Sequence, residues 1–143
     1  MTRAGLSLAT LLIGAGMASA AMAADVTVTL TGVQPAGGRV LVSLQSAGEF
    51  MKPEGRFGAI ADGATGGEAT VVVRNVPPGE YAVMVLHDAD GDMKMAREAN
   101  GRPTEGWAMS GQAPAGRKPT FDEVKVVVPD AGTTVTLPMV YSR

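Results

Sequence analysis

The sequence has no cysteine, one histidine, one tryptophan and only 4% aromatic residues. Without cysteine the chain can form no disulfide bond and can carry no lipid at a cysteine, so packing must hold the fold together. The 12 Lys and Arg residues against 14 Asp and Glu give a net charge of −2 and form no basic stripe. This balance predicts no nucleic-acid partner. Helical periodicity is also nearly absent, which leaves strands as the main regular structure.

The N-terminus has the layout of a secretory signal peptide. Arg3 supplies a positive charge, residues 6–17 form an uncharged apolar run, and Ala21-Met22-Ala23 fits a small-x-small cleavage site. The alternative is a membrane anchor, but the run is shorter than the roughly 18 to 20 residues of a membrane span. No later segment is long and apolar enough to span. We therefore expect a signal peptide at 1–23, one domain at 24–143, and a periplasmic or extracellular location.

Alternating apolar residues recur along the rest of the chain. They occur in "VTVTLTG", "RVLVSLQ", "EATVVVRNV", "EVKVVVPD" and "TTVTLPMVYS", where Pro138 favours an edge or a bulge. "YAVMVLHD" is apolar on both faces, which is typical of a central strand. Turn-forming runs such as "QPAGG", "VPPGE" and "PDAGT" separate these segments. The pattern predicts an all-β fold, a single antiparallel β-sandwich of the immunoglobulin-like or transthyretin-like kind.

Residues 89–120 break this rhythm with 32 positions that show no convincing strand. Connections this long are uncommon in compact domains and are usually functional or disordered. The segment contains Trp107 and several methionines, side chains that usually pack. It is therefore predicted to be one long ordered loop excursion folded over one end of the sandwich.

Three motifs carry a family resemblance: "PPGEYAVMVLHDADGDMKM", "GRPTEGWAMSG" and "KPTFDEV". In order and spacing the chain resembles the bacterial exported proteins of the domain of unknown function 2141 family, from about Gly38 to the C-terminus. The resemblance implies a secreted or periplasmic β-domain and assigns no activity. Two positions depart from the pattern: Ala96 stands where an acid is usual, which weakens an ion site that needs it, and Val124 stands where a small residue is usual.

The "HDADGD" turn is the best candidate site. Asp88, Asp90 and Asp92 place three carboxylates in one short loop, and hard cations such as Ca²⁺ prefer oxygen ligands. The spacing does not fit a helix-loop-helix calcium loop, whose twelfth position is a Glu. A sandwich-end Ca²⁺ site completed by Glu105, Glu98, Asn100 or a backbone carbonyl remains one hypothesis. A solvated acidic turn without an ion is the other.

His87 admits three interpretations. It can be a hydrogen-bonded residue that holds the long loop in place. It can pair with Asp88 or Glu105 near Ser110, since these are the parts of a hydrolase, although no G-x-S-x-G elbow occurs. It can also bind Cu(I) together with Met93, Met95 and Met109, because thioethers and imidazole suit that ion. The rival to the copper site is that these methionines fill gaps under the loop.

Trp107 lies in "TEGWAMSG", where Gly106 permits close approach of another group. It is predicted either to anchor a sugar or peptide by stacking or to insert into the core as the loop's own plug. Together the patterns favour an exported, non-enzymatic binding or accessory module with a calcium-stabilised loop. A hydrolase using His87 with Glu105 and a Cu(I) carrier are the alternatives. A monomer with a protein or glycan partner is expected.

Overall fold

The computed structural model describes residues 22–53, 55–62 and 65–142. Its strands are β1 (Ala24–Val33), β2 (Arg39–Gln45), β3 (Phe57–Asp62), β4 (Gly67–Val76), β5 (Gly79–Asp88), β6 (Gly106–Met109), β7 (Lys125–Val128) and β8 (Thr133–Pro138), and one short helix, α1 (Phe121–Val124), precedes β7. The predicted signal peptide, residues 1–23, lies outside the described residues except for its last two positions. Among the residues described, no helix is long and apolar enough to cross a membrane.

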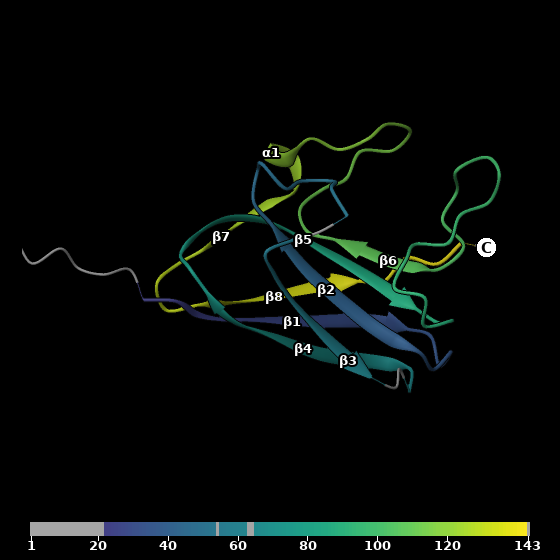
Figure 1. The fold of residues 1–143 in the computed structure, drawn as a ribbon, viewed down its shortest axis with the longest axis horizontal. Helices are drawn as coiled ribbons and strands as arrows, with labels where there is room; N and C mark the ends of the chain where they lie inside the picture. Colours follow the sequence, from purple (N-terminus) through teal and green to yellow (C-terminus); the bar gives the residue numbers. More distant parts are fainter. Residues whose placement is uncertain (1–21, 54, 63–64, 143) are drawn as a thin grey trace, which may run out of the picture.

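The strands form two sheets that pack face to face. A three-stranded sheet has the order β4-β1-β8, and a five-stranded sheet has the order β3-β2-β5-β6, with β7 also paired to β5. Figure 1 shows β2 and β5 crossing over β1 and β8. β6 and β7 share one edge of β5, because β6 pairs with its second half and β7 with its first half. β5 is therefore the central strand of its sheet, as its two apolar faces predict.

The hydrophobic core lies between the sheets and follows the alternation of the sequence. Each strand turns every second side chain inward, so a period of two selects the core residues. The buried set is dominated by β-branched side chains, which suit a pleated surface. Its members on β1, β2, β4 and β5 include Val26, Val28, Leu30, Val40, Val42, Leu44, Val71, Val73, Val83 and Val85. The prediction of an all-β sandwich is confirmed.

Several local predictions need correction. The 89–120 excursion is not free of strands, since it contains β6 and an isolated bridge between Arg97 and Pro103. The alternation pattern missed β3 altogether, because "FGAIAD" is rich in glycine and alanine. Val124 belongs to α1 and not to the following strand. The sandwich also contains one parallel pair, β1 with β8, and Pro138 ends β8 at the edge of its sheet, as proline requires.

Candidate functional site

The carboxylate of Asp88 organises the turn that follows β5. Asp88 is fully buried, with 0% exposure. Its Oδ1 accepts hydrogen bonds from the backbone N–H groups of Gly91 (2.9 Å) and Asp92 (3.1 Å), and its Oδ2 accepts one from Met93 (3.0 Å). Gly91 and Met93 both have positive φ, 78° and 64°. Three N–H donors on one carboxylate therefore hold a sharp turn that few residues adopt freely.

Glu105 ties this turn to the segment that leads into β6. Its Oε1 accepts a hydrogen bond from the backbone N–H of Ala89 (3.1 Å), and its Oε2 accepts one from Ala96 (3.1 Å). Ala96 is the position where the family pattern has an acid, and here only its backbone contributes. One carboxylate thus fixes both ends of residues 89–96, so this part of the excursion has a defined shape.

The four acidic residues predicted to hold an ion come together in space. Asp88, Asp90, Asp92 and Glu105 each offer one oxygen, and these oxygens lie within 4.8 Å of one another. The N–H of Asp92 lowers the pKa of Asp90, but desolvation, a hydrogen bond with Asp88 and the charges of Asp92 and Glu105 raise it by more. The resulting pKa lies above the ordinary value, which indicates that the negative charges are closely spaced.

The carboxylate oxygens of this acidic cluster differ in how many hydrogen bonds they already accept, and therefore in their capacity to coordinate a cation. A carboxylate oxygen can accept two hydrogen bonds, and Asp88 Oδ1 already accepts two. Asp90 and Asp92 each accept one backbone hydrogen bond from the described residues, both through Oδ1, from the N–H groups of Asp92 and Lys94 respectively. Asp90 and Asp92 are therefore the better donors to an ion, and Asp88 is chiefly the organiser of the turn.

His87 lies on the inner face of β5 and is 1% exposed. Its Nδ1 lies 2.7 Å from the Tyr141 hydroxyl, and its Nε2 lies 2.8 Å from the carbonyl oxygen of Gly37. The Tyr141 hydroxyl also accepts the backbone N–H of Gln34. In the neutral tautomer Nε2–H donates to Gly37 while Nδ1 accepts from Tyr141. Both ring nitrogens are engaged, and neither contacts Glu105 or Ser110.

Ser110 fills the gap between β6 and β7 along the edge of β5. Its hydroxyl accepts the N–H of Val83 (2.8 Å) and donates to the carbonyl of Val124 (2.5 Å), while its own N–H donates to Val83 (3.0 Å). Ser110 is fully buried. Val83 lies between the part of β5 that pairs with β6 and the part that pairs with β7, so neither strand bonds its N–H group. The Ser110 hydroxyl accepts that hydrogen bond instead. The structure does not bring Ser110 and His87 together as a nucleophile and its base.

Trp107 and the loop methionines lie on the outer face of the five-stranded sheet. Trp107 is partly exposed, pairs with Val140 through two backbone hydrogen bonds and is absent from the buried core. The interpretation of Trp107 as a core plug is therefore wrong. Gly106 beside it does admit close approach, since a Cβ there would collide with the Tyr141 ring. Met93, Met95 and Met109 line cavities on this outer face, whereas His87 points to the inner one.

The geometry defines a β-sandwich whose strand-end turn is built on the buried carboxylate of Asp88 and carries three further carboxylates close to it. Residues 28–136 match the family described as "Uncharacterized protein conserved in bacteria (DUF2141)", and the chain belongs to this family. No curated protein and no solved structure matches the chain.

The polar residues of the family motifs have a common role here. His87, Asp88, Glu105 and Ser110 each bond backbone groups that the strands leave without partners. Sequence reasoning missed Tyr141 as the partner of His87, although the alternation in "TLPMVYS" does place Tyr141 in phase with the core. It also missed the cavities on the outer face, whose signal was the second apolar face of β5.

Proposed function

We propose that this protein is an exported, non-enzymatic binding or accessory module that holds Ca²⁺ at its Asp88–Asp92 turn. The observation that supports the ion is the convergence of four carboxylate oxygens within 4.8 Å. Ca²⁺ takes six to eight oxygen ligands at about 2.3–2.6 Å, so backbone carbonyls and water would complete the shell. The raised pKa of Asp90 fits a cluster whose mutual repulsion a cation would relieve.

Two observations support a role without catalysis. Both ring nitrogens of His87 already have partners, and the Ser110 hydroxyl both accepts and donates a hydrogen bond. A base that shuttles protons needs a free nitrogen within reach of the group it activates.

The signal-peptide pattern at residues 1–23 supports export. Mass spectrometry of protein recovered from the periplasm tests it, since cleavage after Ala23 leaves Ala24 as the first residue.

Thermal unfolding in EDTA and in excess Ca²⁺ tests the ion site. A ligand that binds only the folded protein adds about 2.7 kcal/mol of stability at a hundredfold excess over its dissociation constant. We expect Ca²⁺ to raise the melting temperature and Asp90→Asn to abolish the rise. Asp90 is chosen because it is exposed and Asn retains the acceptor for the Asp92 N–H.

The matched control is Asp130→Asn, which removes an exposed carboxylate from the β7–β8 turn. It should leave the response to Ca²⁺ unchanged. An equal response in wild type and Asp90→Asn, or none in wild type, would show that the turn is stabilised by its backbone hydrogen bonds alone.

A further inference from the structure

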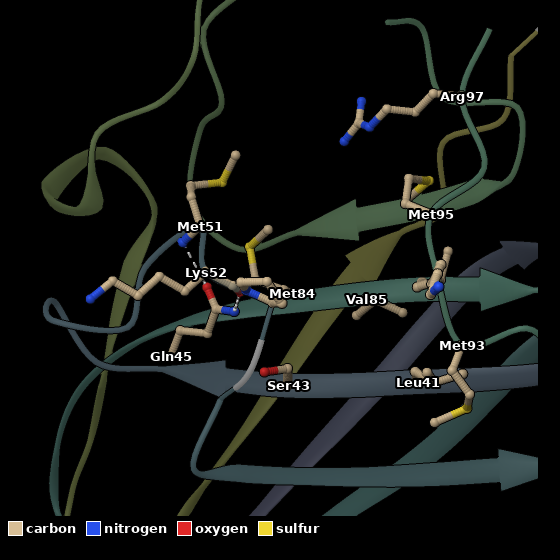
Figure 2. Close-up of a pocket in the computed structure, with 13 residues that line it drawn as sticks. Leu41, Ser43, Gln45, Met51, Lys52, Met84, Val85, Met93, Met95 and Arg97 are labelled. Atoms are coloured by element: carbon tan, nitrogen blue, oxygen red, sulfur yellow. Dashed lines mark hydrogen bonds between the residues drawn. The ribbon is translucent and has the colours of Figure 1, made fainter.

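The outer face of the five-stranded sheet carries a groove that none of the family motifs explains. Its larger lobe has a volume of about 590 Å³, within the range of small-molecule sites. A smaller lobe of about 180 Å³ adjoins it and shares Met51, Met84, Met95 and Arg97 with it. Figure 2 shows these side chains gathered over β2, β5 and β6. We call the two lobes together the methionine groove.

The floor of the groove follows from strand register. Residues opposite one another on paired strands share a face, and here two cross-strand rows lie on the outer face. One row is Ile60, Leu41, Leu86 and Trp107, and the next is Gly58, Ser43, Met84 and Met109. The first row is entirely apolar. The Ser43 hydroxyl in the second row is buried and has no hydrogen-bond partner among the described residues.

Five methionines line the groove, and they come from four separate segments: Met51, Met84, Met93 and Met95, and Met109. Met51 and Met93 are 46% and 47% exposed, although a large apolar side chain gains nothing from contact with water. Both also have positive φ, 61° and 64°, which is uncommon outside glycine. Unbranched thioethers adapt their shape to a partner and are favoured at adaptable binding surfaces.

Hydrogen bonds hold both walls in place. The buried Gln45 side chain accepts the N–H of Met51 (2.9 Å) and donates to the carbonyl of Lys52 (3.0 Å), as the dashed lines in Figure 2 show. On the opposite wall, Asp88 and Asp92 accept the N–H groups of Met93 and Lys94. The groove is therefore largely formed before a ligand arrives, which lowers the entropy cost of binding.

The charged side chains that line the groove have one sign. Lys52, Lys94 and Arg97 line the larger lobe, and no described acidic side chain does. None of the three forms an ion pair with a described residue. Among the described residues that line the smaller lobe, Arg97 alone is charged. The groove therefore offers an apolar bed beside a cationic region, which is complementary to a molecule with an apolar chain and an anionic head.

We propose that the methionine groove binds a single-chain fatty acid, with its chain on the methionine floor and its carboxylate at Lys94 and Arg97. Arg97 borders both lobes, so it can reach a head group whose chain enters the smaller lobe. A guanidinium can bind a carboxylate through two hydrogen bonds. The inference rests on the binding role proposed above and does not require bound Ca²⁺, although Asp88 and Asp92 hold Met93 and Lys94 in the wall.

Fluorescence of Trp107, the single tryptophan of the chain, gives a direct readout because this residue lines the smaller lobe. The protein is titrated in EDTA with decanoate, decanol and decyltrimethylammonium below their micellar concentrations. We expect a saturable change with decanoate and at least tenfold weaker binding of the cation. Dodecanoate should bind about fifteenfold more tightly than decanoate, because it has two more methylenes and each buried methylene adds about 0.8 kcal/mol.

Variants that remove one positive charge distinguish a direct contact with the carboxylate of decanoate from non-specific electrostatic attraction. Lys94→Gln and Arg97→Gln should each weaken decanoate several-fold and leave decanol unchanged. Lys118→Gln, which removes an exposed lysine that lines neither lobe, should change neither. Met84→Gln places a polar group where both lobes meet and should weaken decanoate and decanol alike.

Three results would overturn the proposal. They are no saturable change with decanoate, equal affinity for the anionic and cationic probes, and equal effects of Lys118→Gln and Arg97→Gln. Association of two copies, seen by sedimentation and abolished by Met84→Gln, would assign the groove to self-assembly instead. Because the titration contains EDTA, its failure would leave the calcium response of wild type and Asp90→Asn unaffected.

Discussion

The two faces of the five-stranded sheet are built from alternate residues of the same strands, yet they differ in kind. On the inner face Val42, Leu44 and Val83 are almost completely buried against the other sheet. On the outer face their neighbours Leu41 and Met84 remain partly exposed and line a groove. The inner face is rich in β-branched valine, whose side chain is stiff, whereas the outer face carries methionines, whose unbranched side chains adapt their shape.

This difference separates folding from binding along a single strand. β5 contributes Val83, Val85 and His87 to the interior and Met84 and Leu86 to the groove. Substitutions that alter the groove therefore need not disturb the core. The turn after β5 joins the two functions, because Asp88 is buried at the end of the strand while its hydrogen bonds position Met93 in the wall.

The largest expected effect comes from shortening a core side chain. Leu44→Ala removes a fully buried side chain and should lower the free energy of unfolding by about 3 kcal/mol, as cavity-forming Leu→Ala changes do. Leu41→Ala, three positions earlier on the other face, should cost less than about 1 kcal/mol. Urea unfolding of both variants measures the difference. Equal losses would mean that the outer face is part of the folding core.

A smaller effect is expected at the end of the inner face, where Tyr141 joins His87. Tyr141→Phe keeps the ring but removes the hydroxyl that bonds His87 and accepts the Gln34 N–H. Leaving these groups without their partner should cost about 1–2 kcal/mol in urea unfolding. Tyr81→Phe is the matched control, because among the described residues the Tyr81 hydroxyl makes a single hydrogen bond, which it donates to the carbonyl of Pro77. A greater loss for Tyr81→Phe would contradict a special role for the His87 contact.

The smallest effect is expected from a charge pair that belongs to neither face. The Arg117 guanidinium, followed by the Thr120 N–H, lowers the pKa of Glu123 to about 2. A lowered carboxylate pKa stabilises the fold above the unfolded pKa of about 4.5, and this stabilisation is lost as pH falls through about 2. Glu123→Gln should remove that part of the acid dependence. Unfolding curves of the wild type and the variant between pH 5 and pH 2 test this. Identical acid dependence of the two proteins would show that the Arg117–Glu123 ion pair does not contribute to stability.

Alternation predicted the core because the inner residues obey a strict period of two. It could not find β3, whose "FGAIAD" carries few large apolar residues, or β6, which has four residues inside a region rich in glycine and proline. The parallel pairing of β1 with β8 joins opposite ends of the domain. Such contacts depend on the packed structure and leave no local pattern in the sequence.

The acidic cluster was predictable because three of its members lie within five residues, whereas Glu105 was one of several loop groups that the sequence left open as the fourth ligand. The partners of His87 were not, since Gly37 and Tyr141 lie 50 and 54 positions away. The only indication of the groove in the sequence was the second apolar face of β5. Its two walls come from segments whose positions depend on the buried side chains of Gln45 and Asp88.

The location of the methionines has a chemical consequence. Peroxide converts a thioether to a sulfoxide, which turns a flexible apolar side chain into a polar one. Five methionines line the groove, whereas the buried core residues described here include none. Mild oxidation would therefore make the groove polar, while among the described residues the core has only one thioether packed against it, that of the partly buried Met139. A methionine sulfoxide reductase could restore the groove without any refolding of the protein.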